Sequence, residues 1–126
     1  MELLKIGWLG TRTDRGAEMA DLLQTVLGLR LVHRDLDLWV FQLPDGSKVE
    51  VFGPSSHNEH FTTGPVPGFL VDDLTSAIEE LRAAGVPILS TFWPGKDDVG
   101  WVHFRAPDGR LYEITQGRDL REHLSD

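Results

Sequence analysis

Two glutamates occupy matching places in the sequence and are the side chains best suited to chemistry. Glu50 follows the turn Pro44-Asp45-Gly46 and Glu113 follows the turn Pro107-Asp108-Gly109, so turn and glutamate both recur after 63 residues. Each lies in an apolar stretch, where a carboxylate can bind a hard cation, act as a general base or pair with a cationic ligand. A repeat of this length predicts two packed modules with a site formed between them.

Histidines are the other candidate ligands, because the chain has no cysteine for a thiolate site or a nucleophile. His57, Glu59 and His60 lie close together in a polar stretch, where a solvated loop is the ordinary interpretation and a metal site requires order. Of these, His60 is the best candidate, since Phe61 beside it can anchor the loop. His103 is expected to be a hydrogen-bonded structural histidine.

Composition and charge exclude several classes of partner. The chain has 126 residues, 40% of them hydrophobic, which suits one compact domain. Its net charge is −8 and its basic residues are scattered, so neither nucleic acid nor an anionic membrane is expected as a partner. No stretch has the apolar length of a signal peptide or of a membrane span, and a cytoplasmic location is expected.

The first module, residues 1–53, is expected to contain a strand, a helix and three strands. Apolar runs predict strands at 4–11, 29–34, 38–43 and 48–52. Between the first two runs, apolar residues at helical spacing predict a helix that ends at Gly28. The predicted apolar face of that helix consists of Met19, Leu22, Leu23, Val26 and Leu27.

The same order returns in the second module, residues 66–116, after a polar linker at 54–65 and before a charged tail at 117–126. Strands are predicted at 68–71, 87–91, 100–105 and 111–115. Asp72 or Asp73 is expected to cap a helix that ends near Gly85. The predicted buried face of this helix consists of Leu74, Ala77, Ile78 and Leu81.

Strand alternation predicts which way the glutamates face. Helices cover one side of each sheet, so Glu50 and Glu113 are expected on the other side. If each Pro-Asp-Gly turn closes a simple hairpin, Phe41 pairs with Glu50 and Phe104 pairs with Glu113. The same register places Trp39 opposite Phe52. Aromatic side chains are therefore expected beside both carboxylates, with Trp8 on the same side.

The sequence resembles the vicinal oxygen chelate superfamily, which includes glyoxalase I, extradiol dioxygenases and bleomycin-resistance proteins. The resemblance covers essentially the whole chain. It rests on the repeated unit and on three segments, Val26-Leu27-Gly28-Leu29, Phe69-Leu70-Val71-Asp72-Asp73-Leu74 and His103-Phe104-Arg105-Ala106-Pro107-Asp108-Gly109-Arg110-Leu111-Tyr112-Glu113. It implies an α+β fold in which two βαβββ modules form a partly open barrel around a cup, with the helices on the outer face. It also implies a homodimer.

The resemblance implies a degenerate metal site. Metal-dependent members take ligands from the first and last strand of each module. Here the last-strand positions hold Glu50 and Glu113, but the first-strand positions hold Trp8 and Val66. Neither an indole nor an isopropyl group offers a lone pair to a cation. No metal cofactor is therefore favoured, and a divalent ion, if one binds, is expected on Glu50, Glu113 and His60.

The leading functional hypothesis is a protein that binds a small organic molecule, flat or cationic, in a metal-independent cup. The expected lining consists of Trp8, Trp39, Phe41, Glu50, Phe52, Val66, Phe104 and Glu113. The alternative is a divalent-metal-dependent lyase, isomerase or dioxygenase that uses Glu50 and Glu113. A third possibility is an interaction module whose cup is filled by its own side chains.

Overall fold

A computed structural model describes residues 1–56, 64–92 and 99–117 and contains two successive copies of a βαβββ unit. The first copy consists of β1 (Lys5–Arg12), α1 (Gly16–Asp21) with the helical turn η1 (Leu22–Val26), β2 (Arg30–Asp35), β3 (Leu38–Gln42) and β4 (Lys48–Phe52). The second consists of β5 (Val66–Leu70), α2 (Leu74–Ala83), β6 (Ile88–Phe92), β7 (Gly100–Arg105) and β8 (Leu111–Gln116). The predicted α+β class and its repeated unit are confirmed.

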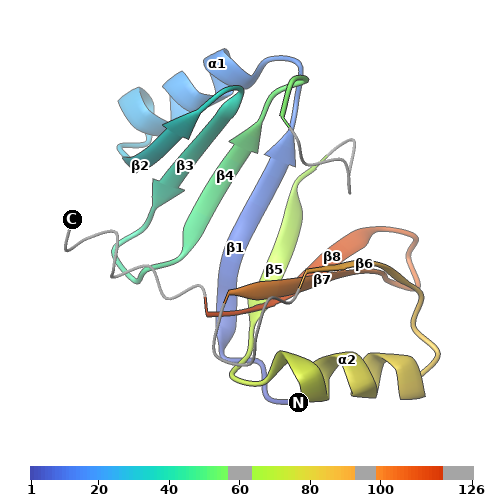
Figure 1. The fold of residues 1–126 in the computed structure, drawn as a ribbon. Helices are drawn as coiled ribbons and strands as arrows, with labels where there is room; N and C mark the ends of the chain where they lie inside the picture. The colour runs from blue at the N-terminus through green and yellow to red at the C-terminus, as the bar shows by residue number, and fades with distance from the viewer. Residues whose placement is uncertain (57–63, 93–98, 118–126) are drawn as a thin grey trace. The chain divides into compact units, whose positions relative to one another are not determined.

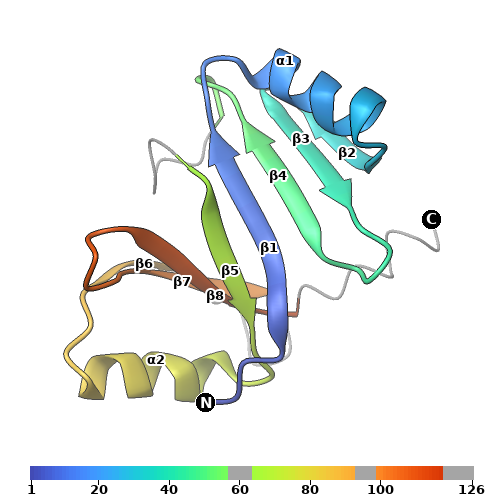
Figure 2. The same cartoon turned by 180° about the vertical axis from the view of Figure 1, so that it is seen from behind.

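The described chain divides into two compact units, which we treat separately. The amino-terminal unit is residues 8–65, and the carboxy-terminal unit combines residues 1–7 with residues 66–117. Strands run in the order β2-β3-β4-β1 in the former and β5-β8-β7-β6 in the latter (Figures 1 and 2). In each unit the first and last strands of the repeat are parallel neighbours, β1 beside β4 and β5 beside β8.

The core of the amino-terminal unit lies between its helix and its sheet. Ala20 and Leu23 pack against three alternating strand side chains, which are Trp39, Phe41 and Val51. All five are buried, which removes apolar surface from water and stabilises the unit. This cluster identifies the helix-covered face of β3 and β4.

The first helix differs from the predicted one in its second half. After Asp21 the backbone continues as a π-helical turn, in which the amide of Leu27 donates to the carbonyl of Leu22 at 3.0 Å. The π turn takes more residues than an α turn, so later side chains rotate away from the α-helical face. Val26 and Leu27 are consequently exposed, although their spacing predicts one apolar face with Leu23. Leu22, at the start of the turn, is exposed as well.

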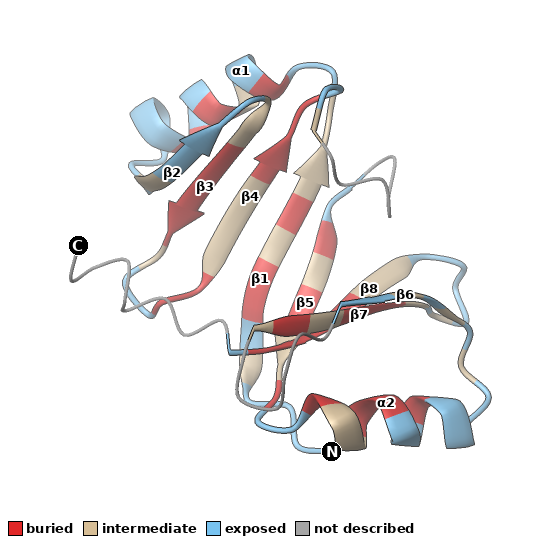
Figure 3. Ribbon diagram, viewed as in Figure 1, coloured by how far each residue is buried: buried red, intermediate tan, exposed pale blue. Residues whose placement is uncertain are grey.

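The helix of the carboxy-terminal unit agrees with its prediction. The four predicted face residues Leu74, Ala77, Ile78 and Leu81 are buried, and Figure 3 shows buried positions on the side of α2 toward the strands. Asp73 caps α2 by accepting a hydrogen bond from the amide of Ser76. At the same end, the buried side chain of Gln116 accepts from the amide of Leu74 at 2.8 Å.

The predicted strand register is wrong by one residue in both units, and the Pro-Asp-Gly turns explain why. Each turn is a three-residue loop rather than an even one: Leu43 pairs with Ser47, and Ala106 pairs with Arg110. The glycine of each loop has a positive φ, 88° at Gly46 and 83° at Gly109. A type I turn followed by a left-handed glycine is the usual way to close such a loop.

This shift changes which neighbours the glutamates have. Val40, not Phe41, lies opposite Glu50, and His103, not Phe104, lies opposite Glu113. The phenylalanines belong to the helix-covered faces, because a one-residue slip exchanges the two faces of a strand. Trp39 moves with Phe41 for the same reason.

Candidate functional site

A row of four residues crosses the carboxy-terminal sheet on the face opposite α2. Cross-strand pairing aligns Gly68 of β5 with Glu113 of β8, Glu113 with His103 of β7, and His103 with Ser90 of β6. All four alternate with residues of the helix-packed cluster, such as Val102 and Ile114. Strand geometry therefore places them together on the helix-free face.

His103 lies between the two other polar residues of this row, Glu113 and Ser90. Its Nδ1 lies 3.0 Å from the hydroxyl oxygen of Ser90, within hydrogen-bonding distance. Its Nε2 lies 3.1 Å from Oε1 of Glu113. That second contact has the length of a hydrogen bond but not its full alignment, so we describe it as an electrostatic contact. Both side chains are only 1% exposed, and a contact so protected from water is weakly screened.

The second carboxylate oxygen of Glu113 has an unusual environment. Oε2 is buried and has no hydrogen-bond partner among the described residues. An oxygen in this state costs about 1–3 kcal/mol unless a donor reaches it. Such a group in a folded protein indicates a donor from a ligand, an ion or a water molecule.

Two features keep side chains of the first strand away from Glu113. Gly68, its neighbour on β5, has no side chain to project over the carboxylate. Val66, which lies two residues earlier on the same face, is too short to reach across the glycine position. Neither residue therefore places a side chain over the carboxylate, although both are themselves buried.

The matching row of the amino-terminal unit is built differently. Val40, Glu50 and Gly10 align across β3, β4 and β1. Here the indole of Trp8 covers the glycine, since a Cβ added at Gly10 would lie 2.1 Å from the Cη2 atom of Trp8. Trp8 is 1% exposed, and its ring contacts Phe52 with centroids 6.5 Å apart. The space beside Glu50 is therefore filled by an aromatic ring.

An aromatic pair lies on the same face as the carboxy-terminal row. Trp101 is two residues before His103 and pairs with Phe92, which is two residues after Ser90. Their ring centroids are 4.5 Å apart. Phe92 is 43% exposed, so this pair offers an accessible aromatic surface next to the polar row.

The predicted site residues separate into three groups. Trp8, Glu50 and Phe52 share the helix-free face of the amino-terminal unit, and Val66 and Glu113 share that of the carboxy-terminal unit. By contrast, the remaining three pack on the helix-covered faces, and their predicted orientation was wrong: Trp39, Phe41 and Phe104.

Sequence reasoning missed two of the residues that lie beside Glu113. His103 was expected on the helix-covered face, and Ser90 was not considered. The signal that locates His103 is the three-residue loop between β7 and β8, because that loop sets His103 opposite Glu113. Ser90 lies on β6, whose register with β7 the loop does not set. His60 and the rest of the 57–63 stretch lie outside the described residues.

The described residues do not fit the divalent ion that the resemblance implies. Trp8 and Val66 occupy the first-strand positions without a donor atom. Among the described residues, the histidine near Glu113 is His103, whose two ring nitrogens are directed at Ser90 and Glu113. Within residues 1–56, 64–92 and 99–117, no three histidine, aspartate or glutamate side chains form a group that could hold a metal.

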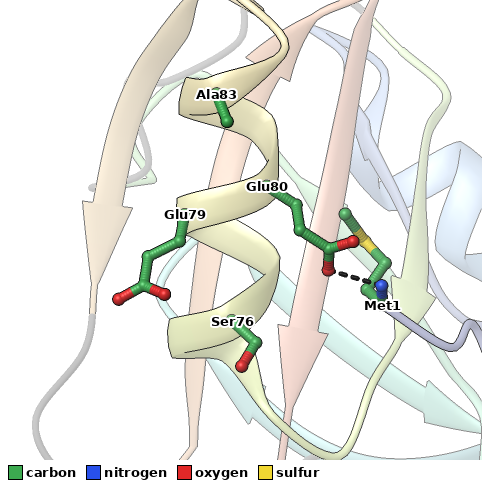
Figure 4. A pocket seen from close by; sticks show the side chains of 5 residues that line it. All are labelled: Met1, Ser76, Glu79, Glu80 and Ala83. Carbon is green, nitrogen blue, oxygen red and sulfur yellow. Dashed lines mark ion pairs between the residues drawn. The ribbon is translucent and has the colours of Figure 1, made fainter.

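A surface depression beside α2 is a separate feature and carries no comparable chemistry. It is lined by Met1, Ser76, Glu79, Glu80 and Ala83 (Figure 4). The amino group of Met1 forms an ion pair with Glu80, which neutralises that charge, while Glu79 points away from the pair. We assign no ligand to it.

Among the described helices, none has the length and apolar character needed to cross a membrane.

Comparison with known proteins identifies relatives of this fold. A model of the Glyoxalase/Bleomycin resistance protein/Dioxygenase superfamily matches residues 5–114. No curated protein matches the sequence significantly. A hypothetical protein from Bacillus halodurans C-125 is similar in structure, with 18% identity, a TM-score of 0.69 and coverage of 89% of this chain and 93% of that one.

Two further solved structures have named activities. Methylmalonyl-CoA epimerase from Mycobacterium tuberculosis shares 17% identity at a TM-score of 0.70, covering 90% of this chain and 88% of that one. BphC, described as a halotolerant catechol dioxygenase, shares 22% identity at a TM-score of 0.67, covering 91% of this chain and 40% of that one. Identities this low show a common fold alone.

Proposed function

Because the chain belongs to the Glyoxalase/Bleomycin resistance protein/Dioxygenase superfamily, we propose that it binds a small organic molecule without a metal, at the helix-free face beside Glu113. The observation that carries the proposal is the carboxylate of Glu113, which is 1% exposed and has one oxygen without a partner among the described residues. A ligand that donates to Oε2 removes the cost of burying that oxygen.

The surroundings of Glu113 favour a flat ligand with a donor group, and a cationic one above all. A carboxylate attracts a cation, and the net charge of −8 adds a favourable long-range field. Phe92 and Trp101 offer aromatic surface for stacking and for cation–π contact. A neutral donor can satisfy Oε2 but lacks the charge.

The proposal is tested with three probes of nearly one shape: benzamidinium, benzamide and benzoate. Each is titrated into ¹⁵N-labelled protein, and the shifts of backbone amides near Glu113 are followed by NMR. Benzamidinium should bind most tightly, benzamide more weakly, and benzoate should not bind because it has no donor and repels the carboxylate.

Glu113→Gln is the decisive variant and Glu50→Gln its matched control, since the two glutamates occupy equivalent places in the repeat. Glu113→Gln should weaken benzamidinium binding by tenfold or more, which is about 1.4 kcal/mol. Glu50→Gln should leave it nearly unchanged. Equal binding of benzoate, or equal loss in both variants, would contradict the proposal.

The alternative is a divalent-metal-dependent lyase, isomerase or dioxygenase in which Glu50 and Glu113 hold the ion. This alternative is favoured by the named activities of two structural neighbours, an epimerase and a dioxygenase. It is less well supported because Oε1 of Glu113 already contacts His103 and because Trp8 and Val66 supply no ligand.

We also propose that the protein is a homodimer that acts in the cytoplasm. Support for an interface comes from η1 and the residue after it, where Leu22, Val26 and Leu27 expose 43%, 70% and 61% of their surface. Adjacent exposed apolar side chains of this kind often mark a contact with another protein.

A further inference from the structure

The two ring nitrogens of His103 make different demands on their neighbours. Nε2 faces Oε1 of Glu113 at 3.1 Å, and Nδ1 faces the hydroxyl of Ser90 at 3.0 Å. A neutral imidazole has one N–H and one lone pair, and an imidazolium has two N–H groups. A carboxylate oxygen offers only lone pairs, so the contact with Glu113 is attractive only when the proton is on Nε2.

Ser90 is the residue that can support this choice from the other side of the ring. A serine hydroxyl can donate to an unprotonated Nδ1 or accept from Nδ1–H, so on its own it fits either tautomer. The carboxylate of Glu113 favours the proton on Nε2, and the hydroxyl of Ser90 then donates to Nδ1 of the neutral imidazole. Ser90 is half-buried in β6, with its side chain on the same face as His103. A donor at Nδ1 therefore stabilises the tautomer whose Nε2–H faces Oε1 of Glu113.

We propose that Ser90 and His103 are positioning residues that hold the Glu113 carboxylate by Oε1 and leave Oε2 as the sole acceptor for a ligand's N–H or O–H group. The inference rests on the proposed function and specifies its selectivity. With its proton on Nε2, His103 presents an N–H group to Oε1. A ligand must then bring its own donor to Oε2, and ligands that present only lone pairs are rejected.

The cross-strand neighbour of Glu50 in the amino-terminal unit differs from that of Glu113. Val40 takes the place that His103 takes beside Glu113, and its isopropyl group can donate nothing to Glu50. In the same row Trp8 covers Gly10, whereas the short Val66 stands before Gly68. The two glutamates therefore differ in their cross-strand neighbour, which is an imidazole at Glu113 and an isopropyl group at Glu50.

The tautomer of His103 is the direct test. Long-range ¹H–¹⁵N NMR correlations distinguish Nε2–H from Nδ1–H, with the signal assigned from its absence in His103→Gln. The wild type should show a proton on Nε2. Ser90→Ala should lower the fraction with that proton and weaken benzamidinium binding about tenfold, the effect of losing one hydrogen bond's orientation. An Nδ1–H tautomer in the wild type would overturn the inference.

Two further variants separate positioning from a general loss of structure. Ser90→Thr keeps the hydroxyl and should restore both the tautomer and the affinity. Thr91→Ala is the control, because Thr91 is the exposed neighbour on β6 whose side chain points to the opposite face. An unchanged tautomer in Ser90→Ala, or equal effects of Ser90→Ala and Thr91→Ala, would also overturn the inference.

Failure of the proposed function can be distinguished from failure of the positioning role. If no probe binds but the Nε2 proton depends on Ser90, the positioning of Glu113 stands and the assignment of a donor ligand to it falls. If benzamidinium binding depends on Glu113 but the tautomer of His103 is unchanged in Ser90→Ala, the proposed function stands and the positioning role falls.

Discussion

At the scale of single residues, Glu50 and Glu113 differ through the groups that touch them. Glu113 is buried, contacts an imidazole and has one oxygen without a partner among the described residues. Glu50 is half-buried, next to Val40 and to a glycine that an indole covers. Equivalent positions in a repeat thus need not have equivalent chemistry, because one neighbour on each side decides what the carboxylate can do.

The contact between Trp8 and Gly10 gives a prediction of its own. In Gly10→Ala the new Cβ would lie 2.1 Å from Cη2 of the buried indole, which must move. We expect the free energy of unfolding to fall by about 1–3 kcal/mol, as overpacking usually costs. Urea unfolding measures the loss.

The control for this variant is the same substitution in a Trp8→Leu background. With the indole gone, the alanine should cost much less, and the two changes should be non-additive by 0.5 kcal/mol or more. An identical loss in both backgrounds would show that the strain does not come from the indole.

At the scale of elements, the turns explain most of what sequence reasoning missed. Most strand and helix positions were predictable, because hydrophobic periodicity and the capping residue Asp73 indicate them. The register was not, since it depends on whether Pro-Asp-Gly closes an even or a three-residue loop. Asp45 and Asp108 each accept a hydrogen bond from the amide two residues later, and this detail accompanies the three-residue loop in both units.

The helix η1 was a second miss with a local cause. The spacing of Leu22, Val26 and Leu27 suits an α-helix, yet the backbone makes a π turn there. Periodicity reports which residues would share an α-helical face and carries no information on a change of winding.

The start of α2 provides the prediction at this scale. Gln116→Ala removes the acceptor from the buried amide of Leu74 and should cost about 1–3 kcal/mol in the free energy of unfolding. Hydrogen exchange of the Leu74 amide should accelerate at the same time. Asp73→Ala, which removes a more exposed cap, should cost about 1 kcal/mol and serves as the comparison. Unchanged protection of Leu74 in Gln116→Ala would refute this role.

At the scale of the whole molecule, the repeat is the feature that the sequence states most clearly. Both βαβββ units form with the predicted order of elements, and the family assignment agrees with them. The candidate site was predicted only in part. Glu113 was identified from its repeated turn, whereas His103 and Ser90 come to it through cross-strand pairing that a linear pattern does not specify.

Self-association is the prediction that concerns the whole molecule. We expect a dimer by size-exclusion chromatography with light scattering, and a monomer for Val26→Asp, because a buried charge opposes an apolar interface. Leu36→Asp is the matched control, since Leu36 is 71% exposed on the turn between β2 and β3 and should leave the dimer intact. A monomeric wild type, or a dimeric Val26→Asp, would refute the proposed interface.

The central claim, that Glu113 serves an organic ligand rather than a metal, is tested most directly by calorimetry. Protein treated with EDTA is titrated with Mn²⁺, Co²⁺, Ni²⁺ and Zn²⁺, with Glu113→Ala as the control. We predict no stoichiometric binding, because Trp8 and Val66 offer no ligand and Oε1 of Glu113 is held by His103. One ion bound per chain in the wild type and lost in Glu113→Ala would contradict the claim.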